Sequence, residues 1–273
     1  MVEAGGAQVV PILLDWTEEE HKLVFSYING ILIPGGPGSP TTDKVTKVAN
    51  IYWNLAIEAN NNKDYFPLWG TCLGFEIMAY LGANKSDIFS NCTGAYNQLL
   101  PIRPSAQFNS SRLFGSMPVE LQNALIYDPI EPNFHHFCLS PESFDRNNLT
   151  RMFKSLATSK VPDETQFIAA IEAINYPFYA VQWHPEKNVY EWSRQINVNR
   201  SDTANAVTAY FGRFLVKEAM KSRHNFPNTT IEDKYLIYNY CPQFSGRNGG
   251  DVTQNYVFFQ SNLASAAQNC RQG

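Results

Sequence analysis

Residues 66–76 place a single thiol between an apolar run and a helix-forming run. The apolar residues 65–69 predict a buried strand, the sequence Gly-Thr-Cys-Leu-Gly at 70–74 predicts a tight turn, and residues 75–81 predict a helix. A cysteine at this corner lies at a helix N-terminus, where unpaired backbone N–H groups and the helix dipole favour an anion. We therefore predict that Cys72 is a catalytic nucleophile with a lowered pKa.

A second apolar run, residues 178–184, leads into His184-Pro185-Glu186-Lys187, where proline stops the strand. A nucleophilic thiol needs a base within hydrogen-bond reach and a group that holds the tautomer of that base. We predict that His184 is the base and Glu186 the orienting carboxylate. A lone histidine is more often structural, so the prediction depends on both strands ending at one edge of the sheet, where ligands bind.

Attack on an amide creates an oxyanion, which two backbone N–H groups can stabilise. We expect one donor at Leu73, directly after the nucleophile, and the other at Gly35 or Gly36 in Pro34-Gly-Gly-Pro37. Glycines let the backbone approach a substrate closely. Without the remaining site residues, this segment would predict only a tight turn.

Strand and helix patterns alternate along the first part of the chain. Residues 8–14 predict a strand buried on both faces, 18–25 a helix capped by Asp15 or Thr17, 30–34 a strand and 43–59 a helix. Residues 84–150 predict an irregular or hairpin-rich excursion, which includes an aromatic and imidazole cluster at 133–137. Residues 166–172 and 178–184 predict a hairpin, and 204–219 a helix.

This alternation predicts an α/β fold with a doubly wound, mainly parallel sheet flanked by helices. We find no repeat or linker, so we expect one domain over residues 1–245 and a polar, poorly ordered tail over 246–273. The hydrophobic content of 44% supports a sizeable core, and a net charge of −4 without a Lys/Arg stripe argues against nucleic acid. No apolar run reaches the roughly 18 residues of a membrane span.

The cysteines and the Asn-x-Ser/Thr sites provide evidence about the cellular compartment of the protein. With Cys72 free, the other four cysteines could form two disulfides or remain buried thiols, and the pairing stays open: Cys92, Cys138, Cys241 and Cys270. Six asparagines are glycosylation candidates, although accidental matches are an alternative: Asn84, Asn91, Asn109, Asn148, Asn199 and Asn228. The N-terminal residues show no secretion signal.

Longer motifs around these residues resemble the gamma-glutamyl hydrolase family. They are 69–76 (Trp-Gly-Thr-Cys-Leu-Gly-Phe-Glu) and 181–187 (Val-Gln-Trp-His-Pro-Glu-Lys), with further similarity at 29–36, 133–135 and 177–182. The family is a branch of the class I glutamine amidotransferase-like group, which has a flavodoxin-like fold, and the similarity runs from Glu3 to Phe244. The resemblance implies a cysteine peptidase that cleaves γ-glutamyl bonds of folylpoly-γ-glutamates and antifolate polyglutamates through an acyl-enzyme.

The resemblance also implies no metal or cofactor, a homodimer, and a lysosomal, vacuolar or extracellular location. By motif, Cys72, His184 and Glu186 carry over as the catalytic residues. Four further residues match positions around the substrate cleft and are expected to position the glutamyl tail: Glu76, His135, Gln182 and Lys187. Alternatively, Glu76 could pair locally, and Lys187 could be a solvated surface charge.

The family's first strand–helix unit and its signal peptide are not found in this sequence. Loss of an interior strand leaves neighbouring backbone groups unpaired, so we expect lower stability than in a full-length relative. Two other functions remain open: a glutaminase-type amidotransferase subunit that feeds a separate synthetase, and a truncated, catalytically impaired glycoprotein. Products formed from a polyglutamate and from glutamine would distinguish the three.

Overall fold

The computed structural model describes residues 1–162, 164–249 and 252–258. Its central sheet has six strands in the order β1-β2-β10-β9-β8-β5. Their bounds are β1 Ile31–Ile33, β2 Leu68–Thr71, β5 Arg103–Pro104, β8 Phe153–Lys160, β9 Gln166–Ala173 and β10 Phe178–Val181. The α/β class is confirmed. Within the described residues the sheet is mixed rather than mainly parallel, because β1, β2 and β10 run parallel whereas β9, β8 and β5 continue in antiparallel pairs.

Helices cover both faces of the sheet, as the strand–helix alternation predicts. Side chains of α1 (Glu18–Phe25), α2 (Lys44–Asn61) and α3 (Leu73–Gly82) share one buried cluster with Leu68 and Phe178. Those of α4 (Val119–Tyr127) and α7 (Asp202–Ala219) share a second cluster with Trp69 and Tyr179. Successive residues of β2 and β10 thus point into opposite cores, which explains why both strands are apolar throughout.

The expected strand at residues 8–14 is wrong, since this segment has no strand structure. Val10 and Ile12 still pack against the first core, but β1 is the edge of the described sheet and does not pair with this segment. The Val9 carbonyl instead accepts a hydrogen bond of 2.9 Å from the Ile237 N–H. An apolar run becomes a strand only where a neighbour completes its hydrogen-bond ladder. The capped helix that follows is confirmed, because Thr17 and Glu20 form a capping box.

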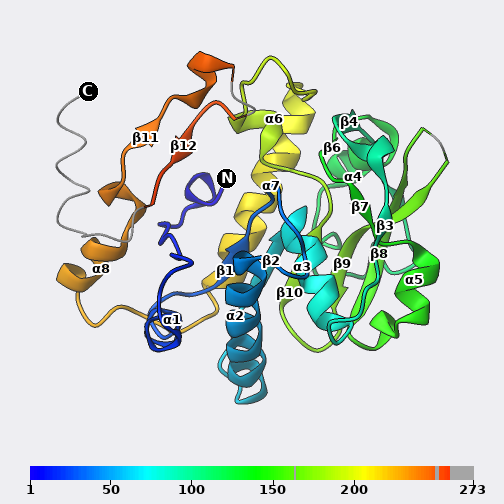
Figure 1. The fold of residues 1–273 in the computed structure, drawn as a ribbon. Coiled ribbons are helices and arrows are strands. Elements are labelled where there is room, and N and C mark those ends of the chain that lie inside the picture. Colours follow the sequence, from blue (N-terminus) through cyan, green and yellow to red (C-terminus); the bar gives the residue numbers. More distant parts are fainter. Residues whose placement is uncertain (163, 250–251, 259–273) are drawn as a thin grey trace.

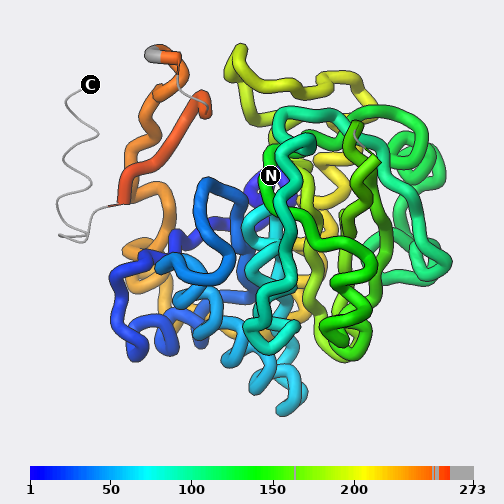
Figure 2. The backbone as a smooth tube through the Cα atoms, turned by 45° about the vertical axis from the view of Figure 1, so that its right-hand side comes forward, coloured from blue at the N-terminus to red at the C-terminus, as the bar shows by residue number. Residues whose placement is uncertain are grey.

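The excursion at residues 84–150 lies beyond β8 and β9, on the side of the molecule opposite to the C-terminal segment (Figures 1 and 2). It contains short elements only: η2 Thr93–Ala95, β3 Ser90–Asn91, β4 Gln98–Leu99, β6 Pro132–Asn133, β7 Phe137–Cys138, α5 Pro141–Arg146 and η3 Leu149–Arg151, besides α4 and β5. A disulfide joins Cys92 to Cys138, and Cys241 is disulfide-bonded as well. Cys270 lies outside the described residues.

The remaining elements precede α1 or follow β10 along the chain. They are η1 Glu3–Gly5, α6 Lys187–Tyr190, α8 Thr229–Tyr235, η4 Ile237–Asn239, β11 Pro242–Gln243, η5 Ser245–Asn248 and β12 Asn255–Tyr256. The expected tail from residue 246 begins inside η5, and β12 pairs back onto β11; residues 259–273 are outside the described part. Among the described residues, none of the helices has both the length and the apolar character of a membrane span.

Candidate active site

Cys72 occupies the corner between β2 and α3 in a backbone conformation that side chains rarely adopt, with φ of 52° and ψ of −107°. The flanking glycines permit this corner. A Cβ at Gly74 would lie 2.1 Å from the Ile33 carbonyl oxygen, and one at Gly70 would lie 2.6 Å from the Gly74 carbonyl oxygen. The sequence Gly-x-Cys-x-Gly is therefore a packing requirement of the strained turn at Cys72.

The parallel register of β2 and β10 brings His184 beside Cys72. Thr71 pairs with Val181, and the Cys72 N–H donates to the Val181 carbonyl at 2.9 Å. A Cβ built at Gly35 would lie 3.0 Å from His184 Nε2 and 3.1 Å from Cys72 Cβ, so both side chains flank the same glycine. The expectation that the two strands end at one edge is confirmed.

Glu186 holds His184 in the orientation that a base requires. His184 Nδ1 lies 2.7 Å from Glu186 Oε1, which leaves Nε2 on the side of Gly35, the glycine that Cys72 also flanks. The backbone of His184 is fixed too, because its N–H donates to the Pro132 carbonyl at 2.8 Å. Burial opposes ionisation of Glu186, but its bond to His184 and the His184 charge hold the Glu186 pKa below its usual value.

The expected lowering of the Cys72 pKa is wrong. Burial raises the pKa of the thiol well above its ordinary value, and the carboxylates of Glu76 and Glu186 raise it further. The Leu73 N–H, which bonds to the sulfur, and Lys187 lower it by less. Desolvation of a side chain that is 4% exposed outweighs the helix N-terminus, so the thiol of the unliganded site is protonated. A thiol in this state can act as a nucleophile only if a base takes its proton.

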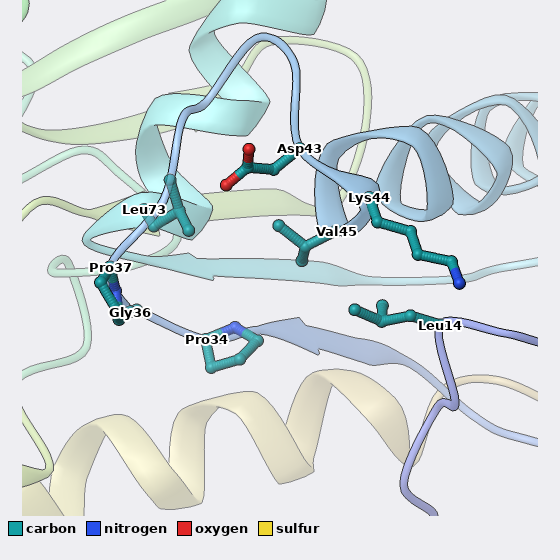
Figure 3. A pocket seen from close by; sticks show the side chains of 9 residues that line it. Leu14, Pro34, Gly36, Pro37, Asp43, Lys44, Val45 and Leu73 are labelled. Atoms are coloured by element: carbon teal, nitrogen blue, oxygen red, sulfur yellow. The ribbon is translucent and has the colours of Figure 1, made fainter. Parts of the chain in front are cut away.

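The expected oxyanion donors line one cavity beside Cys72. The walls of a cavity of about 440 Å³ include Gly35, Gly36 and Leu73, and also Leu14 and Lys44. Figure 3 shows Leu73 and Pro37 at one end and Leu14 and Lys44 at the other. Gly35 lies against the side chains of Cys72 and His184, whereas a Cβ at Gly36 would meet nothing within 4 Å. The structure thus distinguishes Gly35 from Gly36, whereas the sequence offered no reason to prefer either glycine as the second N–H donor.

Glu76 and Gln182 form a buried pair next to Cys72. Gln182 Nε2 donates to Glu76 Oε1 at 3.0 Å, and the Glu76 N–H donates to the Cys72 carbonyl at 3.0 Å. Burial raises the pKa of Glu76 to about 8, so this side chain is mostly uncharged at neutral pH. These contacts support the alternative that Glu76 pairs with a neighbouring residue.

His135 is buried and does not present a free nitrogen to a cleft. Its Nδ1 lies 2.8 Å from the Phe137 carbonyl oxygen, and its Nε2 lies 3.1 Å from Asn133 Oδ1. Burial lowers its pKa to about 4, so the ring is neutral at physiological pH. His135 lies close to Cys92 and Cys138, but the disulfide engages both sulfurs, which are then not free to ligate a metal. These contacts indicate a role in fixing the loop of residues 133–137.

Lys187 is half-buried, and its Nζ lies 5.0 Å from the centre of the Phe134 ring. No carboxylate of the described residues forms an ion pair with it, so its charge is available to an anionic ligand. The Phe134 ring in turn meets His184 edge-on at 5.8 Å and Tyr96 at 5.7 Å, and Tyr96 stacks on His136 at 4.9 Å. Tyr96 was missed by the sequence reasoning, although the cluster at 133–137 was visible.

The six glycosylation candidates differ in accessibility. Asn84, Asn91, Asn109, Asn148 and Asn228 are exposed, whereas Asn199 is half-buried. The Asn199 side chain also accepts from the Ser201 N–H at 2.9 Å and contacts the Pro129 carbonyl at 3.4 Å. Asn199 is therefore the least suitable acceptor of the six.

Comparison with known proteins assigns the chain to a class. The family model "Glutamine amidotransferase class-I" matches residues 2–200, so the chain belongs to the class I glutamine amidotransferase family. A solved structure of a GMP synthase subunit from Thermoplasma acidophilum covers 81% of this chain and 83% of its own, with a TM-score of 0.45 and 13% identity.

Similar proteins with known names identify the family within this class. Gamma-glutamyl hydrolase of Rattus norvegicus and that of Homo sapiens are each 37% identical over 257 residues, which cover 94% of this chain and 80% of the relative. Gamma-glutamyl hydrolase B of Dictyostelium discoideum is 38% identical over 259 residues, covering 94% and 74%. The chain belongs to the gamma-glutamyl hydrolase family.

Proposed function

We propose that this chain hydrolyses γ-glutamyl amide bonds of folylpoly-γ-glutamates and antifolate polyglutamates through a thioester intermediate on Cys72. The observation that carries the proposal is the meeting of Cys72, Glu186-bound His184 and the Gly35 backbone at one strand edge. A neutral thiol, an oriented imidazole and adjacent N–H donors are the parts that acyl transfer from an amide requires.

The cycle begins with a protonated thiol. His184 Nε2 accepts the Cys72 proton as the sulfur attacks the γ-carbonyl carbon, and the resulting oxyanion is stabilised by the N–H groups of Leu73 and Gly35 or Gly36. The imidazolium then protonates the amine as the C–N bond breaks, leaving a thioester. A water molecule gives its proton to His184 and attacks the thioester, and the thiolate regains the proton as the acid departs. Glu186 stabilises each imidazolium state.

Substrate recognition follows from the charge and rings around His184. Lys187 supplies a cation for a glutamate carboxylate of the γ-linked chain, since it forms no ion pair among the described residues, although its charge also acts on Glu186. The faces of Phe134, Tyr96 and His136 extend from His184 to exposed positions and offer stacking surfaces for the aromatic head of a folate. Glu76 and Gln182 act from behind Cys72, where they fix the nucleophile turn.

We further propose a lysosomal, vacuolar or extracellular protein that is glycosylated at exposed sequons and forms a homodimer. The two disulfide-bonded positions Cys92 and Cys138, together with Cys241, support an oxidising compartment. Mass determination before and after removal of N-glycans from protein made in a secretory host tests the modification. Light scattering at several concentrations tests the dimer.

The activity is tested by incubating the protein with a pteroyl-polyglutamate and, separately, with glutamine, and following both products by chromatography. We expect release of glutamate or poly-γ-glutamate from the first substrate, and its loss in Cys72→Ala. Ammonia from glutamine without cleavage of the polyglutamate would indicate the glutaminase function instead. No turnover of either substrate by a folded protein would indicate an inactive glycoprotein.

A further inference from the structure

The Cys92–Cys138 disulfide joins the two segments that carry the aromatic rings of the candidate site. Tyr96 lies shortly after Cys92 in one segment, whereas Phe134 and His136 precede Cys138 in the other. The two cysteines are 46 residues apart in the sequence, so the bond holds together parts of the excursion that are distant along the chain. The proposed reaction itself does not use this disulfide.

Two short ladders flank the rings. At one end β4 pairs with β6, and the Pro132 carbonyl of β6 also accepts the His184 N–H at 2.8 Å. At the other end β3 pairs with β7 beside the disulfide, and the Cys92 N–H donates to the His136 carbonyl at 2.8 Å. Each of these four strands has two residues. A two-stranded ladder is marginally stable in water on its own, so the end at β3 and β7 depends on the covalent bond.

The rings between the two ladders contact one another and remain partly exposed. Tyr96 stacks on His136 with ring centres 4.9 Å apart and planes at 7°, and it meets Phe134 edge-on at 5.7 Å. Tyr96 is 45% exposed, His136 is exposed and Phe134 is half-buried. Because these rings are not enclosed by a close-packed core, their spacing is set by the two backbone segments that carry them.

The disulfide itself is buried. Cys92 is 5% exposed and Cys138 is 0% exposed, and His135 Nδ1 lies 3.9 Å from Cys138 Sγ. Thiol–disulfide exchange requires access to a sulfur atom, so a reductant in solution reaches this bond slowly. The burial therefore favours a permanent cross-link over a redox switch.

We propose that Cys92 and Cys138 are positioning residues, whose disulfide fixes the spacing of Tyr96, His136 and Phe134 and thereby the affinity for the aromatic end of the substrate. This inference rests on the proposed function. Without the disulfide the two segments stay attached at β4 and β6, beside His184, but the rings must be ordered anew each time a substrate binds. His184 keeps its orientation, because its bond to Glu186 at 2.7 Å does not involve either segment.

The first test removes the disulfide in a double variant, Cys92→Ser with Cys138→Ser, and measures hydrolysis without added reductant. We expect KM for a pteroyl-polyglutamate to rise about 3- to 10-fold, which is the cost of ordering one or two side chains on binding. We expect kcat to stay within about threefold, because the geometry of Cys72 and His184 is kept. KM for γ-glutamyl-glutamate, which has no aromatic end, should not change. An unchanged KM for the pteroyl substrate, or an equal rise for both substrates, would overturn the proposal.

Two further variants separate positioning from a general loss of stability. Cys241→Ser is the matched control, because it removes the disulfide of Cys241 in the C-terminal segment, on the opposite side of the molecule from the excursion, and should leave both KM values unchanged (Figures 1 and 2). In a Tyr96→Leu background, loss of the Cys92–Cys138 bond should raise KM for the pteroyl substrate by less than about twofold more, since the ring that it positions is already absent. A full additional rise in that background, or the same KM change in Cys241→Ser, would contradict the proposal.

The second test needs no substrate and stands if the proposed function fails. Hydrogen exchange followed by mass spectrometry should show amides of β3 and β7 exchanging as slowly as those of β8 in the wild type, although each short strand has two residues. In the double variant we expect exchange in β3 and β7 to be at least about tenfold faster, with β8 unchanged. Equal rates in the two proteins would overturn the proposal. Fast exchange of β3 and β7 in the wild type would overturn it as well, even if the double variant does not fold.

Discussion

Substitution of alanine for Gly35 should disable the site while leaving the fold intact. The added Cβ would lie 2.4 Å from His184 Cε1 and 3.1 Å from Cys72 Cβ, whereas ordinary van der Waals contacts are 3.4–4 Å. The His184 ring must therefore move by about 1 Å, although it is anchored to Glu186 at 2.7 Å. A displacement of about 1 Å at a reacting group costs on the order of 100-fold in rate. We expect a comparable fall in kcat for Gly35→Ala.

Gly36→Ala is the matched control, because the same methyl group meets nothing within 4 Å at that position. Neither glycine has the left-handed backbone that would strain an alanine, and both variants keep the backbone N–H proposed for the oxyanion. Steady-state hydrolysis of a pteroyl-polyglutamate, with thermal melts of all three proteins, measures the difference. Similar kcat values for Gly35→Ala and Gly36→Ala, both near wild type, would refute the placement of His184 and Cys72 around Gly35.

Three other predictions concern charge, recognition and stability. Glu76→Gln should leave the rate of Cys72 alkylation by iodoacetamide nearly unchanged at pH 7 but increase it above pH 8. Glu76 of the wild type becomes an anion only above about pH 8, and its charge then raises the pKa of the thiol. Equal alkylation rates of the two proteins at pH 9 would contradict this prediction. Tyr96→Leu should raise KM for a folyl substrate about 3- to 10-fold through lost stacking, and not KM for γ-glutamyl-glutamate; a parallel rise in both would argue against head-group binding. Glu218 accepts a hydrogen bond from the Tyr179 hydroxyl at 2.8 Å and one from Lys221 at 2.5 Å. Despite burial, these bonds lower the pKa of Glu218 in the folded protein. Its carboxylate therefore stabilises the fold at pH values above the pKa of about 4.3 in the unfolded chain, and this stabilisation is lost as the pH falls through the folded-state pKa. Glu218→Gln should thus lower the melting temperature at pH 7 and much less at pH 3.5, and an equal decrease at both would contradict the assignment.

The local elements were predictable because their signals lie within a few residues. The capping box of Thr17 and Glu20, the apolar period of residues 43–59 and the two glycines around Cys72 each require a particular local conformation. The joint placement of Cys72 and His184 was predictable for a related reason. Each follows an apolar strand, and parallel strands of one sheet present their carboxyl ends at the same edge.

Features that depend on distant partners were not predictable in this way. Residues 8–14 have the composition of a strand and yet form none, since no neighbouring ladder is present among the described residues. The eight-residue strand β8 was not expected, although it pairs along the length of β9 and converts half of the sheet to antiparallel pairing. Strand formation depends more on neighbours than on the segment itself.

The sequence by itself determined which residues are proposed for the chemistry: a thiol on a glycine-bounded turn, a His-Pro-Glu segment that ends a strand, and a pair of glycines after another strand. The tertiary structure alone decided the protonation states that make this chemistry work. Burial raises the pKa values of Cys72 and Glu76, so that the thiol is protonated and Glu76 is mostly neutral at pH 7. Desolvation and charge coupling are sums over atoms that are remote along the chain, which is why no motif reports them.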